Sequence, residues 1–145
     1  MIVIEREVAV AATPERVFDY LSDFRTTEEW DPGTVRTVLL QGDGGIGTTY
    51  RNTSRFSGRE TELIYEVVER IRPERLVLRG ENRTVVAHDT MRFFSEGHVT
   101  RVVYRAEFRL KGLARLAEPF FRKPFDRLGE EAEEGLRNAL GRLAA

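Results

Sequence analysis

The chain has 145 residues, of which 41% are hydrophobic and 32% charged, and its formal net charge is −1. A chain of this length buries roughly 68% of its unfolded surface when it folds alone, so we expect a single domain over residues 1–145. The near-zero net charge gives no bulk attraction to nucleic acid or anionic lipid, and the absence of cysteine excludes disulfides, thiolate nucleophiles and cysteine-based metal sites.

The first segment, MIVIEREVAV, is rich in β-branched residues and predicts a strand over residues 2–10. The charges of Glu5, Arg6 and Glu7 interrupt it, so it lacks the apolar run of a signal peptide, and we expect a cytoplasmic protein. No segment approaches the roughly 20 apolar residues that a membrane-spanning helix needs. We therefore expect no membrane insertion.

Two short helices are predicted after this strand. Thr13 can cap a helix that begins at Pro14. A second short helix is expected over residues 23–30. It must end there, because Asp31 precedes Pro32 and is pushed toward extended geometry. Helices this short form no core of their own, so we expect a larger element to lie across them.

From residue 34 to residue 110 the apolar period changes to two, which predicts about six antiparallel strands. The turn-forming clusters that divide them lie at 42–47, 57–60, 72–75, 80–84 and 95–98. The first cluster, GDGGIG, satisfies the G-x-G-x-x-G pattern of dinucleotide-binding turns, which requires a helix behind it. The next residues, TTYRNT, predict a strand instead. We therefore interpret the cluster as a hairpin turn.

Alternation assigns side chains of these strands to an inner face. The inward residues are Tyr50, Asn52, Ser54, Phe56, Tyr65, Asp89, Met91, Phe93 and Tyr104. Each polar group among them costs about 1–3 kcal/mol if buried without a partner. Polar groups scattered among aromatic ones are typical of ligand pockets. In the alternative interpretation, these groups satisfy one another or lie near strand ends in water.

The tail from about residue 113 to residue 143 predicts a helix, whose first part Pro119 and Pro124 should kink or split. Its apolar stripe consists of Phe121, Phe125, Leu128, Ala132, Gly135, Leu136, Ala139 and Leu143. Ala132, Gly135 and Ala139 are small. Small residues either leave space above the sheet or permit close helix packing, and periodicity does not distinguish the two.

Candidate catalytic residues are few. His88 and His98 stand outside any metal-binding spacing, so we expect no metal site and no bound cofactor. Asp89 is the acid to follow, because an inward carboxylate without a partner has a raised pKa and can move a proton near neutral pH. A cation paired with Asp89 would instead lower its pKa and make it a structural residue.

Several motifs in the chain resemble one known family. In chain order they are A-x-P-E-x-V-F-D-Y-L-S-D-F, W-D-P-G, G-x-G-T-x-Y, Y-E-V-V-E-x-x-x-P-E-R-L-V-L-R and T-R-V-V-Y-R. Together they resemble the polyketide cyclase/dehydrase branch of the START-like (SRPBCC) superfamily, over nearly the whole chain. The resemblance implies an α+β helix-grip fold: a seven-stranded antiparallel sheet around the long C-terminal helix, two short helices after the first strand, and an internal cavity. It also implies that Trp30 helps to form the end wall of that cavity.

We therefore expect an apolar cavity of roughly 300–1,000 Å³. The candidate ligand-binding residues are Trp30, Tyr50, Asn52, Phe56, Tyr65, Asp89, Met91, Phe93, Tyr104, Phe125 and Ala132. The first hypothesis is binding of a hydrophobic or aromatic small molecule, such as a polyketide, a lipid or a quinone-like compound. The second is a cyclase or dehydratase in which Asp89 moves a proton and tyrosine hydroxyls hold substrate carbonyls. The third is a protein-interaction module that uses the cavity rim. The sequence gives no oligomeric state.

Overall fold

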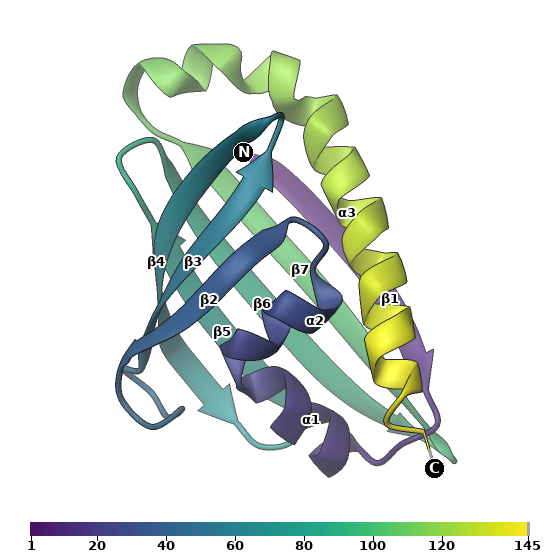
Figure 1. The fold of residues 1–145 in the computed structure, drawn as a ribbon. Coiled ribbons are helices and arrows are strands. Elements are labelled where there is room, and N and C mark those ends of the chain that lie inside the picture. Colours follow the sequence, from purple (N-terminus) through teal and green to yellow (C-terminus); the bar gives the residue numbers. More distant parts are fainter. Residues whose placement is uncertain (145) are drawn as a thin grey trace.

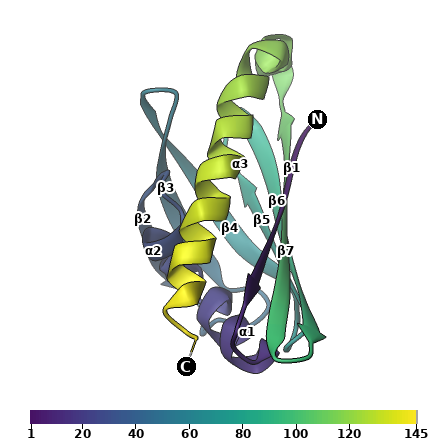
Figure 2. The same cartoon turned by 90° about the vertical axis from the view of Figure 1, so that its right-hand side faces the viewer.

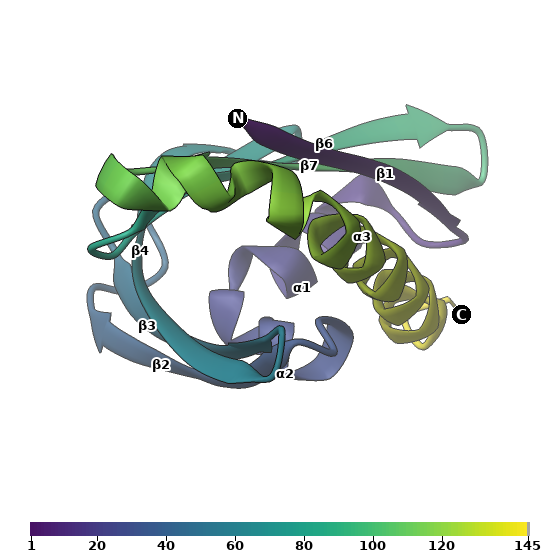
Figure 3. The same cartoon turned by 90° about the horizontal axis from the view of Figure 1, so that it is seen from above.

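The structure, a computed structural model, describes residues 1–144. Within this range seven strands form one antiparallel sheet in the order β1-β7-β6-β5-β4-β3-β2. The strands are β1 (Ile2–Val10), β2 (Thr34–Gln41), β3 (Thr49–Phe56), β4 (Arg59–Ile71), β5 (Arg75–Glu81), β6 (Val85–Glu96) and β7 (Val99–Leu110). The sheet curves around one long helix, α3 (Glu118–Gly141), as Figures 1 and 3 show.

The short helical segments follow β1 and precede β2 in the sequence, and in space they close one end of the curved sheet (Figure 1). They are α1 (Pro14–Ser22), the 3-10 turn η1 (Phe24–Thr26) and α2 (Thr27–Trp30). The side-chain oxygen of Thr13 accepts a hydrogen bond from the backbone N–H of Arg16 at 3.2 Å, which confirms the predicted cap. At the C-terminal end of α2, Asp31 has extended geometry before Pro32 and ends the helix, also as predicted.

The C-terminal tail is helical, and its first part is divided from the rest, as predicted. The tail begins with a 3-10 turn, η2 (Gly112–Ala117), and Pro119 lies in the first turn of α3. Pro119 costs no hydrogen bond there, because the first N–H groups of a helix have no partner within it. Pro124 lies inside α3, which stays continuous across it. The tail is therefore divided before Pro119 and is not split at Pro124, and Figure 3 shows its first part running at an angle to the rest of α3.

Helix α3 packs mainly against β1, and Figure 2 shows the two elements side by side. Glycine makes this contact possible. A Cβ atom added at Gly129 would lie 2.6 Å from the Cγ2 atom of Ile4. A Cβ atom at Gly135 would overlap the backbone carbonyl oxygen of Trp30, so this glycine lets the end of α2 approach the helix.

The glycine-rich segment 42–48 is a turn between β2 and β3, as predicted, and no helix follows it directly. Gly42, Gly44 and Gly47 have φ angles of 101°, 103° and 91°, the left-handed region that glycine adopts without strain. A dinucleotide-binding turn needs a helix directly behind it to hold the pyrophosphate, and here a strand follows, so the segment is not such a turn.

Burial confirms the alternation predicted for the sheet. On β6, Asp89, Met91 and Phe93 are buried, whereas Arg92 is exposed. The predicted architecture is confirmed as well: a seven-stranded antiparallel sheet, short helices after the first strand and a long C-terminal helix. Among residues 1–144, no helix is both long and apolar enough to cross a membrane.

Candidate functional site

A cavity of about 640 Å³ lies between the inner face of the sheet, α3 and the short helical segments. Its lining residues differ in exposure along its length. At one end Ser57, Arg59 and Thr84 are exposed, and we call this the open end. At the other, which we call the inner end, lie Trp30, Asp31, Tyr65, Asp89 and Tyr104. All but Asp31, which is half-buried, are buried.

Most of the candidate ligand-binding residues line this cavity. They are Trp30, Asn52, Phe56, Tyr65, Asp89, Tyr104, Phe125 and Ala132. Tyr50, Met91 and Phe93 point to the same face of the sheet but are buried away from the cavity. The Tyr50 ring lies 5.7 Å from that of Phe24, and the Phe93 ring lies 5.2 Å from that of Phe18. The short helical segments therefore cover this part of the inner face.

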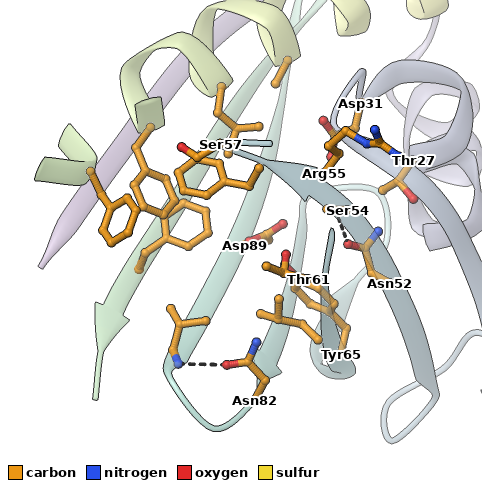
Figure 4. Close-up of a pocket in the computed structure, with 18 of the residues that line it drawn as sticks. Thr27, Asp31, Asn52, Ser54, Arg55, Ser57, Thr61, Tyr65, Asn82 and Asp89 are labelled. Carbon is orange, nitrogen blue, oxygen red and sulfur yellow. Dashed lines mark hydrogen bonds between the residues drawn. The ribbon is translucent and has the colours of Figure 1, made fainter. Parts of the chain in front are cut away.

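Asp89 is the most unusual residue of the inner end. Its side chain is 5% exposed, and Figure 4 shows its carboxylate facing the cavity. The Tyr104 hydroxyl donates a hydrogen bond to Oδ2 at 3.3 Å, while Oδ1 is buried and has no hydrogen-bond partner among residues 1–144. Burial, followed by the charge of Asp31, raises the pKa of Asp89 from 3.8 to about 7, and the Tyr104 hydrogen bond offsets part of this rise.

A second carboxylate, Asp31, lies in the same cavity because α2 ends there. Its Oδ1 accepts a hydrogen bond from the backbone N–H of Gly33 at 3.1 Å, and its Oδ2 accepts one from the Thr34 hydroxyl at 2.9 Å. Burial raises the pKa of Asp31, and these two hydrogen bonds oppose the rise. The inner end therefore holds two carboxyl groups. The backbone of Arg55 lies near Asp31, because its N–H donates to the Gly33 carbonyl at 2.7 Å, but its guanidinium pairs with Glu60 at 3.3 Å, and Arg59 lies at the open end.

Trp30 adds a hydrogen-bond donor without a partner. Its ring meets the Tyr104 ring edge-on, with the centroids 5.6 Å apart, and its Nε1 atom is buried with no hydrogen-bond partner in the described part of the chain. Leaving such a group unpaired costs about 1–3 kcal/mol. The inner end thus contains one buried donor, Trp30 Nε1, and one buried acceptor, Asp89 Oδ1, that no other described residue satisfies.

Tyr65 forms another side of the inner end. It lies opposite Gly80 on the neighbouring strand, and a Cβ atom at position 80 would lie 2.6–2.8 Å from three atoms of the Tyr65 ring. The glycine therefore lets the ring lie flat against the sheet. Burial, followed by the charges of Asp89 and Asp31, raises the pKa of Tyr65 well above its ordinary value, so its hydroxyl stays protonated.

The polar residues of β3 are satisfied within the protein. The Asn52 side chain donates hydrogen bonds to the hydroxyls of Thr34 at 3.1 Å and Thr37 at 2.9 Å, and it accepts one from Ser54 at 2.6 Å. Figure 4 shows the Ser54 contact on the cavity wall. For Asn52, then, the alternative interpretation from the sequence holds: its polar groups are satisfied by their neighbours.

Toward the open end the wall is aromatic. The ring of Phe125 on α3 lies 4.5 Å, centroid to centroid, from the rings of both Phe56 and Phe108. Phe121 lies 5.9 Å from Phe56. An apolar molecule in this half would contact aromatic rings from α3, β3 and β7.

Asp31 and Phe108 line the cavity but were missed as site residues in the sequence. Asp31 was assigned only the role of ending a helix, and its place before Pro32 gives no signal that it faces a cavity. Phe108 could have been found, because the alternation of β7 places it on the same face as Tyr104. Among residues 1–144, no group of three or more potential metal ligands lies close enough to hold an ion.

Comparisons with known proteins agree with this geometry. The family described as polyketide cyclase / dehydrase and lipid transport matches residues 1–145. No curated protein matches the chain closely enough to count as a relative. Several solved structures share the fold.

A protein of Thermus thermophilus has a TM-score of 0.81 and 19% identity, with 99% of each chain covered. A START superfamily protein of Mycobacterium smegmatis has a TM-score of 0.80 and 16% identity, with 97% of this chain and 98% of that chain covered. The Zhui aromatase/cyclase of a Streptomyces species has a TM-score of 0.78 and 18% identity, with 98% of this chain and 92% of that chain covered.

Proposed function

Because the chain belongs to the polyketide cyclase / dehydrase and lipid transport family, we propose that it binds a hydrophobic or aromatic small molecule, such as a polyketide, lipid or quinone-like compound, in the cavity. The observation that carries the proposal is the cavity itself, about 640 Å³ with aromatic walls and with the buried, unpartnered Asp89 Oδ1 at its inner end. Ligand sites in proteins have this size and this mixture of apolar wall and few polar groups.

The charges of the cavity define the polar end of the ligand. Asp31 and Asp89 lie at the inner end, the Arg55 guanidinium is paired with Glu60, and Arg59 lies at the open end. A hydroxyl group at the inner end of the ligand can donate a hydrogen bond to Asp89. A carboxylate there would be repelled by both carboxyl groups in a medium of low dielectric constant. The ligand therefore enters with an uncharged hydrogen-bond donor first.

The test uses two matched fluorescent probes, 9-anthracenemethanol and anthracene-9-carboxylate. Trp30 is the only tryptophan of the chain and lines the cavity, so energy transfer from Trp30 to anthracene reports binding. We expect saturable binding of one alcohol per protein, and at least about tenfold weaker binding of the carboxylate at pH 8. Absence of saturable binding by either probe would refute the binding function. Equal binding of both would refute only the assigned polarity.

A second function, general acid–base catalysis, is favoured by the raised pKa of Asp89. A pKa of about 7 allows a carboxyl group to donate or accept a proton at neutral pH, and the Tyr104 hydroxyl lies beside it. The expected reaction class is proton transfer next to a carbonyl, as a cyclase or dehydratase requires. Asp89 would take the proton, and Tyr65 or Tyr104 would hold the carbonyl oxygen.

Deuterium exchange at the α-carbons of 2-tetralone, followed by proton NMR, tests this function without knowledge of the natural substrate. We expect the protein to accelerate exchange, and Asp89→Asn to lower the accelerated rate by about 100-fold or more. The variant should still bind 9-anthracenemethanol, which shows that the cavity is intact. Exchange at the uncatalysed rate in the wild-type protein would refute the catalytic function and leave the binding function standing.

A further inference from the structure

The segment that crosses the open end exposes large apolar side chains. It consists of η2 and the first turn of α3, and Figures 1 and 3 show it spanning this end of the molecule. Leu113 is 85% exposed, Leu116 75% and Phe120 81%. Single exposed apolar residues are ordinary, but three together on one segment mark an interaction surface.

The spacing of the three residues places them on one side of the segment. In a 3-10 turn, residues three apart lie above one another, and in an α-helix residues four apart do so. Leu113 and Leu116 are three apart, and Leu116 and Phe120 are four apart. Ala114 and Phe121, by contrast, line the cavity. The segment is therefore apolar toward the cavity and apolar again toward solvent.

Basic residues flank these apolar residues in the sequence. Between residues 109 and 123 the chain has five basic residues and one acidic residue, Glu118, although its net charge is −1. Glu118 is neutralised by the N-terminal ammonium group at 2.9 Å and by Arg122 at 3.4 Å. Arg115 and Lys123 form no ion pair with any residue in the range 1–144. Lys111 is paired with Glu81 at 2.8 Å, whereas Arg59 and Arg83 add positive charge at the same end of the sheet.

We propose that this docking face, formed by Leu113, Leu116, Phe120, Arg115 and Lys123, binds an anionic membrane surface. Apolar side chains flanked by lysine and arginine enter the boundary between headgroups and acyl chains, and the basic groups contact anionic lipid. Net charge does not reveal such a surface, because acidic residues elsewhere cancel the local excess. A protein partner with an apolar patch would require no such concentration of positive charge.

The orientation of a docked molecule follows from the position of the docking face. The face lies over the open end, so docking directs the cavity toward the bilayer, and an apolar ligand could pass between bilayer and cavity without crossing water. This consequence rests on the proposed binding function, whereas docking itself does not. A protein whose cavity binds nothing would still associate with vesicles.

The test measures sedimentation of the full chain with vesicles of phosphatidylcholine alone or with 30% phosphatidylglycerol, a composition chosen on the order of natural anionic membranes. We expect binding to the anionic vesicles that weakens as salt rises from 0.05 to about 0.5 M. The triple variant Leu113→Ser, Leu116→Ser and Phe120→Ser should bind at least about tenfold more weakly. Ile46→Ser serves as the control, because Ile46 is 70% exposed in the turn at the opposite end of the sheet.

Unchanged thermal unfolding and unchanged binding of 9-anthracenemethanol would show that the triple variant is folded. Equal vesicle binding by the triple variant and the wild type would overturn the proposal, as would equal binding to neutral and anionic vesicles. Analytical ultracentrifugation of the wild type without lipid provides a further test. A dimer that the triple variant abolishes would identify the face as a contact between copies of the chain and would also overturn the proposal.

Discussion

Replacing Asp89 with asparagine should stabilise the protein at alkaline pH but not at acid pH. Folding raises the pKa of Asp89 from 3.8 to about 7, so the folded protein holds this proton more tightly than the unfolded chain does. The contribution to stability is therefore most favourable below about pH 4 and is lost as the pH rises to about 7. Asparagine carries no charge at any of these pH values, so the variant lacks this loss.

The magnitude follows from the two pKa values. Each pKa unit corresponds to about 1.4 kcal/mol, so the ionised Asp89 destabilises the fold by about 4 kcal/mol well above pH 7. Between pH 5 and pH 8, this group alone lowers the free energy of unfolding by about 2.5 kcal/mol. The asparagine side-chain oxygen can still accept the Tyr104 hydrogen bond. The replacement of the carboxyl group by an amide should therefore lower the free energy of unfolding by only about 1 kcal/mol, and this cost does not depend on pH.

Urea unfolding of both proteins at pH 5, 6, 7 and 8 measures the effect. We expect the variant to gain about 2.5 kcal/mol on the wild type between pH 5 and pH 8. Asp126→Asn is the matched control, because Asp126 is exposed on α3, and its replacement should change stability by less than about 0.5 kcal/mol. Parallel pH profiles for wild type and Asp89→Asn would refute the reasoning. So would a carbon-13 NMR titration that places the Asp89 carboxyl at or below about 3.9.

Three further substitutions test the shape of the cavity. Ala132→Phe should abolish binding of 9-anthracenemethanol with little change in melting temperature, because the added ring enters the cavity; a strongly lowered melting temperature would mean that Ala132 serves packing. Gly135→Ala, one turn further along α3, should cost at least about 2 kcal/mol in urea unfolding, because its Cβ overlaps the Trp30 carbonyl oxygen; unchanged stability would contradict this close contact. Gly80→Ala should lower the free energy of unfolding by about 1–3 kcal/mol and weaken probe binding, because the added Cβ pushes the Tyr65 ring toward the cavity. A stable variant that binds the probe tightly would contradict the close contact between Tyr65 and Gly80.

The sequence was sufficient for features that depend on neighbouring residues. The cap at Thr13, the end of α2 before Pro32 and the turn at 42–48 each follow from the preferences of a few adjacent residues. Alternation was sufficient to place Asp89 on the inner face, because the period of a strand is two whatever its surroundings. The family resemblance supplied the number of strands and the expectation of a cavity.

Only the tertiary structure decided what covers each inward side chain. Periodicity predicts which face of the sheet a side chain lies on, but not what packs against it. It therefore could not distinguish Met91, which is buried in the core, from Asp89, which lies two residues earlier and faces the cavity. The same holds on α3, where Ala132 faces the cavity and Gly135 meets the Trp30 carbonyl group. Asp31 joins Asp89 only because α2 ends against the inner end of the cavity. The pKa of Asp89 is raised first by its burial and then by the charge of Asp31, 58 positions away in the sequence, and long-range folding alone creates both.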